Sequence, residues 1–172
     1  GLIVNGELLR GAGAGAGEIG HMVVVPELGE LCRCGQRGCL ETVAAQPVLE
    51  RQIASFPALA AQLDLTQDDV AIMADILQLA EAGQPDVLQL LERLTLFLGI
   101  GLVNLINIVG PKLILLGGMY AQAAVFLLPK LRDIVRQRAF GVLGEQVTID
   151  VASFGEETGV VGAGALALEQ FF

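Results

Sequence analysis

The three cysteines and the only histidine of this chain all lie within 19 residues, from His21 to Cys39. Cys32 and Cys34 stand between them, and the spacing is His-x10-Cys-x-Cys-x4-Cys. Three thiolates and one imidazole are the ligands of a closed tetrahedral zinc site, so this segment is predicted to fold back around one ion. Isolated cysteines are usually buried fillers, but none of these residues is isolated.

The same segment contains Gly35 and Gly38, which permit the tight turns that four ligands of one ion require. A disulfide is the weaker interpretation, because the number of cysteines is odd. Cys32 and Cys34 are also too close in the sequence to bridge easily. We therefore predict a structural zinc ion, Zn2+, held by this cluster.

Two carboxylates, Glu18 and Glu41, bracket the predicted ligands in the sequence. A carboxylate accepts several charge-assisted hydrogen bonds, which suits a neutral ligand that carries hydroxyl groups. The pairing indicates a metal that shapes a binding site and does not itself perform chemistry. The plainer alternatives are a solvated loop acid for Glu18 and a favourable charge in the first turn of a helix for Glu41.

The stretches Gly-Glu-Ile-Gly-His at 17–21 and Cys-x-Cys-Gly-x-x-Gly-Cys-Leu-Glu at 32–41 together resemble the signature of the ROK family. This family comprises repressors, open reading frames and sugar kinases. Weaker similarity continues to the end of the chain, through residues 102–107, 115–118 and 159–163.

The resemblance implies that Glu18, His21 and Glu41 contact a sugar, and that His21 also ligates the zinc ion. One ring nitrogen would bind the metal while the other donates a hydrogen bond to an oxygen. In a kinase of this family, the loop that contains Gly117 and Gly118 would lie beside the adenosine of ATP. A plain turn from strand to helix explains two glycines equally well.

Short strands are predicted where apolar runs stop at turn signals. Asn5-Gly6 is a strong hairpin signal, because both positions tolerate a positive φ. The run from Leu113 to Leu116 is wholly apolar and is expected to be a buried parallel strand. The predicted strands cover residues 2–4, 7–9, 22–25, 113–116 and 147–151.

A long apolar stretch covers residues 94–110, which is 17 residues and includes three polar side chains. It is too short and too polar for a membrane span, so we predict a buried core helix that Pro85 opens and Gly110 ends. Thr66 begins a pattern that resembles a capping box. The predicted helices cover residues 40–46, 47–55, 66–82, 85–109, 121–139 and 158–171.

This order, β-β-β-α-β-α-β-α, predicts an α/β domain with one mixed sheet and a zinc-binding loop at residues 26–39. It is also the order of one half of the actin-like, ribonuclease-H-like ATPase fold, to which the resemblance assigns the chain. The net charge of −9 argues against nucleic-acid binding by this segment. Reduced cysteines and the lack of a visible secretion signal favour the cytoplasm.

The chain contains neither the Asp-x-Gly-x-Thr phosphate loop nor the Asn-Asp pair with the catalytic Asp that a ROK kinase uses. We therefore expect residues 1–172 to be the C-terminal lobe of a ROK domain, without its N-terminal lobe. The preferred expectation is the sugar-sensing, homodimeric half of a transcriptional repressor, which would contact DNA only through an absent N-terminal domain.

Two alternatives stay open. The first is the C-terminal half of a sugar kinase of the glucokinase or N-acetylhexosamine kinase type, which would use ATP and Mg2+. The second is a zinc-stabilised structural module that binds no ligand.

Overall fold

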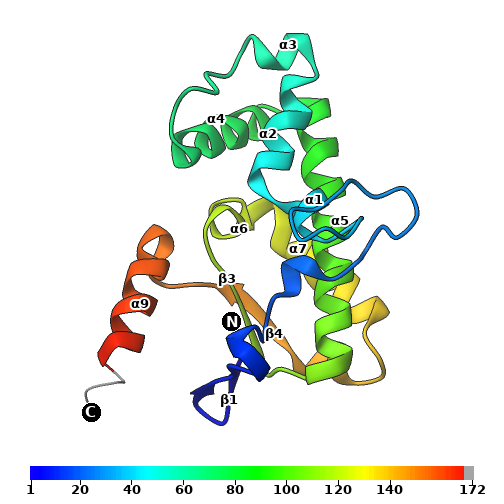
Figure 1. Cartoon of the computed structure of the whole chain (residues 1–172). Helices are drawn as coiled ribbons and strands as arrows, with labels where there is room; N and C mark the ends of the chain where they lie inside the picture. Colours follow the sequence, from blue (N-terminus) through cyan, green and yellow to red (C-terminus); the bar gives the residue numbers. More distant parts are fainter. Residues whose placement is uncertain (169–172) are drawn as a thin grey trace.

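Helices dominate the computed structural model of this chain, which describes residues 1–168. One long helix, α5 (Pro85–Val109), runs through the middle of the molecule (Figure 1). The helix α7 (Ala124–Arg138) packs along it, and these two form the most extensive contact between any two elements. The core is therefore an aliphatic helix pair to which smaller elements attach.

Local signals define both ends of α5. Its first residue is Pro85, whose missing N–H costs nothing at this position. The side chain of Gln84 caps the helix by accepting hydrogen bonds from the backbone N–H groups of Asp86 and Val87. Gly110 ends the helix in the left-handed conformation, with φ 59°. The predicted bounds of this helix are confirmed.

Among the described helices, α5 alone is long and apolar enough to cross a membrane. Half of its most apolar 18-residue window is buried inside the protein, as expected of a core helix. The buried side chains recur every three or four residues, which places them on the faces that contact other elements. They include Val87, Leu90, Leu91, Leu94, Leu98, Leu102, Leu105 and Ile106.

Two glycines let neighbouring segments approach α5 closely. A Cβ atom at Gly99 would lie 2.8 Å from Cγ2 of Ile134 in α7. A Cβ atom at Gly101 would lie 2.6 Å from Cδ2 of Leu40. Residues 22–39, which contain the three cysteines, are called the metal loop. Leu40 follows this loop and directly precedes α1 (Glu41–Ala44), so Gly101 is the notch where the end of the loop is anchored in the core.

Three further helices gather around the N-terminal half of α5, at the top of Figure 1. They are α2 (Gln46–Ala54), α3 (Pro57–Ala60) and α4 (Asp69–Glu81).

The start of α4 differs from the sequence-based expectation. Asp68, not Thr66, caps the helix, because its Oδ1 atom accepts hydrogen bonds from the N–H groups of Val70 and Ala71. Thr66 is engaged elsewhere: its N–H and its hydroxyl both donate to Oδ1 of Asp64. The side chain of Thr66, which would have capped the helix two residues earlier, is therefore already used in a turn.

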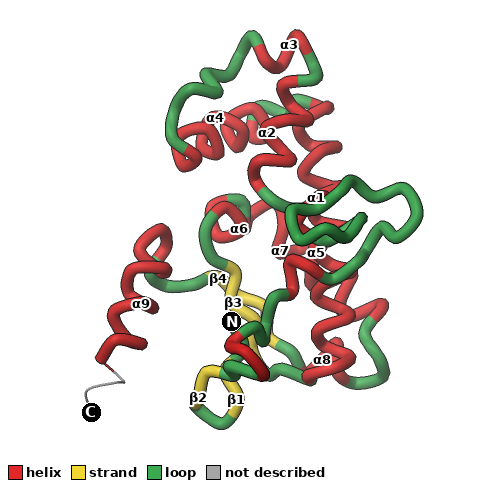
Figure 2. The backbone as a smooth tube through the Cα atoms, in the orientation of Figure 1, coloured by secondary structure: helices red, strands yellow, loops and turns green. Residues whose placement is uncertain are grey.

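The strands form two separate two-stranded sheets within residues 1–168, and not the single mixed sheet that was predicted. The strands β1 (Ile3–Val4) and β2 (Glu7–Leu8) make the predicted antiparallel hairpin. The strands β3 (Leu113–Leu116) and β4 (Thr148–Val151) pair in parallel, with Leu113 opposite Thr148. Figure 2 shows both pairs in yellow.

The predicted third strand at residues 22–25 is absent, and this is why no strand joins the hairpin to β3. Only an isolated antiparallel bridge forms there, between Val23 and Cys39. The N–H groups of Val24 and Val25 both donate to the carbonyl of Gly38. These two donors are therefore bonded within the metal loop and cannot pair with another strand. The buried-strand prediction for β3 is only half right, because Leu113 and Leu115 point outward and are exposed.

The C-terminal part continues with short elements. The helix predicted at 121–139 is two helices, α6 (Met119–Gln122) and α7, which meet at Ala123. The last helix, α9 (Thr158–Leu168), stands away from the body of the molecule (Figure 1). Its predicted end at residue 171 lies outside the described residues. The remaining elements are α8 (Leu143–Gln146) and the 3-10 turns η1 (Ala12–Ala14), η2 (Ile19–His21) and η3 (Gly155–Glu157).

Candidate functional site

The side chains of His21, Cys32, Cys34 and Cys39 converge, and their potential ligand atoms all lie within 4.8 Å of one another. Sγ of Cys32 lies 3.5 Å from Nδ1 of His21, and Sγ of Cys34 lies 3.6 Å from Sγ of Cys39. In a tetrahedral zinc site these edges measure ~3.5 Å for nitrogen to sulfur and ~3.8 Å for sulfur to sulfur. The cluster could therefore hold a metal ion, and its donor set and spacing suit zinc.

A tight turn brings the first two cysteines, Cys32 and Cys34, together. The N–H of Cys32 donates to the carbonyl of Gln36 at 2.8 Å, and the N–H of Gly35 donates back to the carbonyl of Cys32 at 2.9 Å. Gly35 adopts φ 89°, which residues with a Cβ rarely adopt. The turn function predicted for this glycine is thus confirmed.

The loop then crosses itself at two glycines. A Cβ atom at Gly38 would lie 1.8 Å from the carbonyl oxygen of Val25, and one at Gly29 would lie 2.2 Å from Cα of Gly38. Both positions therefore exclude every other residue. The role of Gly29 was not identified from the sequence, because this contact joins backbone segments whose approach no local pattern indicates.

The thiols of Cys34 and Cys39 differ in environment. Cys34 is exposed, and a hydrogen bond from the backbone of Gln36 lowers the pKa of its thiol. Cys39 is buried, and burial raises the pKa of its thiol to about 12. Burial disfavours the thiolate unless a positive charge lies beside it, which is what a metal ion would supply.

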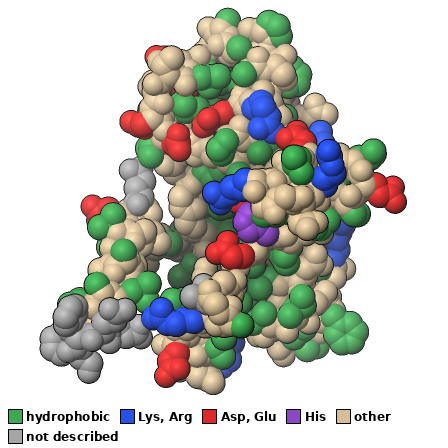
Figure 3. All heavy atoms as spheres, viewed as in Figure 1, with side chains coloured by type: hydrophobic (Ala, Val, Ile, Leu, Met, Phe, Trp, Pro, Cys, Tyr) green, Lys and Arg blue, Asp and Glu red, His purple; other side chains and the backbone are tan. Residues whose placement is uncertain are grey.

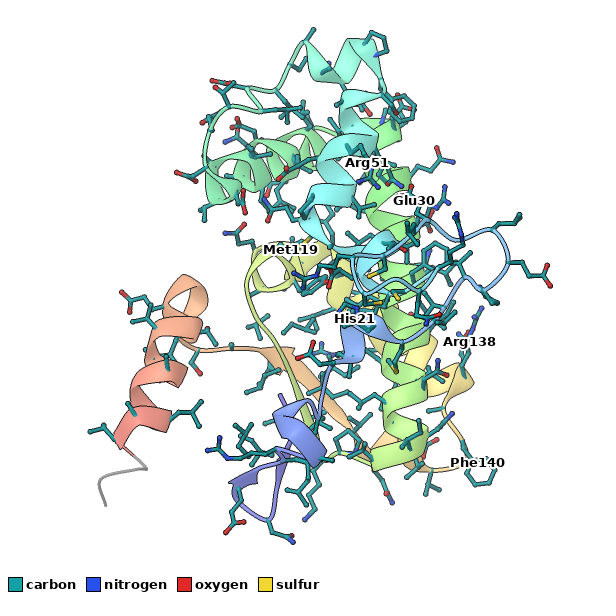
Figure 4. All side chains as sticks on the ribbon, in the orientation of Figure 1. His21, Glu30, Arg51, Met119, Arg138 and Phe140 are labelled. Carbon is teal, nitrogen blue, oxygen red and sulfur yellow. The ribbon has the colours of Figure 1, made fainter. Side chains whose placement is uncertain are left out.

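The imidazole lies at the edge of this cluster. His21 ends η2 and is half-buried. Figure 4 shows it next to yellow sulfur atoms, and Figure 3 shows its purple surface with acidic and basic side chains beside it. Because Nδ1 faces the sulfur of Cys32, the other ring nitrogen, Nε2, lies on the opposite side of the ring. The imidazole can therefore bind a metal and a second partner at once.

Glu41 lies against the same segment. Its Oε2 atom is 3.6 Å from where a Cβ atom of Gly20 would stand, one residue before His21. Arg33, from between two of the cysteines, holds the carboxylate on both oxygens: Nε is 2.9 Å from Oε1 and Nη2 is 3.2 Å from Oε2. The structure thus brings Glu41 to the segment that contains His21, and the guanidinium of Arg33 pairs with the Glu41 carboxylate there.

Glu18 precedes η2 and is exposed. Within residues 1–168, its side chain makes no hydrogen bond and no ion pair. It stands three residues before His21 in the sequence, and its exposed carboxylate is available to accept hydrogen bonds.

The two glycines after β3 form a sharp turn. Gly118 has φ 54° and ψ −137°, a combination that essentially only glycine adopts. No atom lies within 4 Å of where its Cβ would stand, so its conformation, and not a close approach, requires glycine. No ion pair or hydrogen bond in the described part of the chain joins Gly117 or Gly118 to Glu18, His21 or Glu41.

Tyr120, for which the sequence offers no functional signal, makes a polar contact in the structure. Its hydroxyl donates a 2.7 Å hydrogen bond to the carbonyl of Ala44, the last residue of α1. Burial, with a smaller effect from the charge of Glu41, raises the pKa of this hydroxyl to about 12. Tyr120 therefore joins α6 to the helix that carries Glu41. A contact across 76 residues of sequence has no local signal.

The model of the ROK family matches residues 1–170. The glucokinase of Halalkalibacterium halodurans is 31% identical over 99% of this chain and 53% of its own length. The xylose repressor of Bacillus spizizenii is 29% identical over 99% of this chain and 41% of its own length. The chain thus spans about half, or less, of the length of these relatives.

Similarity also extends to solved structures. A ROK family glucokinase from Streptomyces griseus, solved with glucose and AMPPNP, superposes with a TM-score of 0.76 at 30% identity. The match covers 95% of this chain and 55% of that one. Proteins of both kinds, repressor and kinase, are therefore similar to nearly the whole chain.

Proposed function

We propose, from the premise that this chain belongs to the ROK family, that it is the C-terminal, sugar-sensing lobe of a longer, cytoplasmic transcriptional repressor. The observation that carries the proposal is the position of Glu41. This carboxylate follows the buried thiol of Cys39 by two residues and lies against Gly20, beside the only histidine. Hydroxyl groups of a sugar would donate to Glu41 and Glu18 and accept from Nε2 of His21.

Zinc is the metal that we propose for the Cys/His cluster. It would be held by Nδ1 of His21 and by the sulfur atoms of the three cysteines, and it would offset the charge of their thiolates. Binding Nδ1 would fix the imidazole with Nε2–H facing the sugar. The ion would also hold Cys39, and through it the start of α1, in place. Its role here is structural, and the sugar contacts are made by side chains.

Exposed apolar surfaces support the proposal that this lobe packs against another. The outward face of β3 presents Leu113 and Leu115, which are 52% and 56% exposed. The helix α9 is strongly apolar, yet it buries none of its side chains among the described residues. An N-terminal lobe would cover such surfaces, and a homodimer would cover more. The net charge of −9 leaves contact with DNA to a separate domain.

A second candidate is the C-terminal half of an ATP-dependent sugar kinase. The similarity to glucokinases in sequence and in structure favours it. In that case the turn at Gly117 and Gly118 would lie beside the adenosine, and the upstream half would bring the catalytic Asp and Mg2+. Either parent uses the same sugar site.

The test is made on the full-length protein. Its zinc content is measured after purification without chelator, and its affinity for glucose, xylose and N-acetylated hexosamines is measured by calorimetry. Glu41→Gln should weaken sugar binding and leave about one zinc per chain. Glu30→Gln is the matched control, because Glu30 is a loop carboxylate that also pairs with an arginine, Arg51. Absence of zinc, or equal sugar affinity in the two variants, would contradict the proposed site.

The parent is identified in the same preparation. A repressor binds operator DNA with an affinity that sugar changes, and DNA must then change the sugar affinity by the same factor. Sugar-dependent ATP turnover would instead make the protein a kinase.

A further inference from the structure

The carboxylate of Glu41 sits on a helix that cannot hold itself in place. The helix α1 is a single turn, Glu41–Ala44, and Ala45 after it is already extended, with φ −87° and ψ 156°. One turn of helix is unstable in isolation, because its few hydrogen bonds do not offset the ordering of the backbone. The position of Glu41 must therefore be set by contacts from outside the turn.

Two of these contacts act at the N-terminal end of α1. Leu40 inserts into the notch at Gly101 of α5. The hydroxyl of Thr42 donates at 2.7 Å to the carbonyl of Cys39, which lies next to the metal cluster. Both contacts act where the turn begins.

The third contact acts at the other end. The carbonyls in the last turn of a helix lack partners within the helix, and Ala44 provides one of them. The hydroxyl of Tyr120 donates to it at 2.7 Å. Tyr120 is largely buried and packs against the core, and it stands two residues after Gly118 on α6. This bond ties the C-terminal end of α1 to α6.

We propose that Tyr120 is a positioning residue for the sugar: by holding Ala44, it fixes the direction of α1 and so the place of the Glu41 carboxylate. The inference rests on the proposed sugar site. Tyr120 touches neither sugar nor metal in this arrangement and acts only through α1. Small displacements of a positioned group reduce binding strongly, since hydrogen bonds depend on distance and angle.

The bond between Ala44 and Tyr120 also links the proposed sugar site to α6. A sugar that draws Glu41 inward pulls on α1, and the bond from Ala44 to Tyr120 passes the movement to α6 and the turn at Gly118. Sugar binding should therefore protect backbone amides of residues 117–122 from hydrogen exchange. Tyr120→Phe should remove that protection, because the ring stays and the hydroxyl is lost.

The test uses the full-length protein and the sugar that binds it most tightly. Tyr120→Phe is expected to weaken sugar binding about tenfold, with zinc content unchanged. Thr95→Val is the matched control, because it removes another side-chain hydroxyl bonded to a backbone carbonyl, that of Leu91 at 2.6 Å, in the core of α5. It should leave the sugar affinity unchanged. A purely structural role for Tyr120 would make the two variants alike.

A double-mutant cycle then identifies the route. Glu41→Asp retracts the carboxylate by one methylene and leaves measurable binding. If Tyr120 acts through Glu41, the sugar affinity of the double variant should equal that of the more affected single variant. The two losses of affinity then do not multiply. Multiplying losses, or an unchanged affinity in Tyr120→Phe, would overturn the inference and leave the sugar site intact. A wild-type protein that binds no sugar would overturn the site and the inference together.

Discussion

The metal loop, residues 22–39, and the pair of helices α5 and α7 are held together in opposite ways. Leu28 and Leu31 of the loop are 93% and 64% exposed, and the loop contains only isolated β-bridges. The helix pair buries Leu102 and Leu131 almost completely and makes regular backbone hydrogen bonds. Turns and the Cys/His cluster organise the first region, and burial organises the second.

This difference indicates which kind of substitution should destabilise each region. Apolar burial supplies most of the free energy of folding in the helix pair. The loop buries fewer side chains, among them Cys32 and Cys39, so we expect the proposed metal and a few turns to supply much of its free energy of folding. The two regions are joined where Leu40, the residue after the loop, enters the notch at Gly101 of α5. We expect a substitution in one region to disturb that region and to leave the other ordered.

The largest expected effect comes from removing a metal ligand. Cys39→Ser takes one thiolate from the cluster, and structural zinc contributes about 10–16 kcal/mol of apparent binding free energy in small zinc-dependent domains. Zinc content should fall to near zero, and amides of residues 22–39 should lose their protection from hydrogen exchange. Amides of α5 should keep theirs. Unfolding of α5 together with the loop would show that the two regions are not separate.

The next effect tests the other region. Leu102→Ala leaves a cavity at a side chain that is 1% exposed, and such changes cost about 2–5 kcal/mol. Denaturant unfolding monitored by circular dichroism should show this loss. Zinc content measured in the same samples should stay at the wild-type value. A loss of zinc under native conditions would mean that the loop also relies on the core for its order.

Gly101→Ala tests the point where the regions meet. The new Cβ would stand 2.6 Å from Cδ2 of Leu40, and overpacking of this kind costs about 1–3 kcal/mol, partly offset by the better helix propensity of alanine. Because Leu40 is displaced, the sugar affinity should fall along with the stability. Gly99→Ala is the control, since its clash is with Ile134 in α7, and it should lower stability alone.

The smallest effect is expected at Arg33. Its ion pair with Glu41 lies at the surface, where Arg33 is 77% exposed, and such pairs contribute about 0.2–1 kcal/mol. Arg33→Ala should change the melting temperature very little and should leave the zinc in place. Thermal unfolding at low and high salt checks this, because salt screens the pair in the wild type only. A large loss of stability would assign Arg33 a structural part in closing the loop.

Local sequence signals predicted much of this fold. Pro85 and Gly110 mark the ends of α5, and Asn5-Gly6 marks the hairpin, because caps and turns depend on residues next to one another. The spacing of the cysteines and the histidine was enough to select the four side chains that the structure brings together.

The signals failed where distant segments compete for the same backbone or side chain. Residues 22–25 read as a strand, but the crossing at Gly38 takes their N–H groups. Thr66 read as a cap, but Asp64 takes its hydroxyl. The bond between Tyr120 and Ala44 joins parts of the chain that no periodicity connects.

The arrangement of the ligands along the chain bears on the order of events during synthesis. All four lie between His21 and Cys39, and the closed loop is short, so its closure costs little entropy. These residues are synthesised before any part of α5, which begins at Pro85. In the proposed site, the loop could therefore close around its ion before the helix exists. Glu41 reaches its place only once Gly101 and Tyr120 have been made, so metal binding would precede sugar recognition.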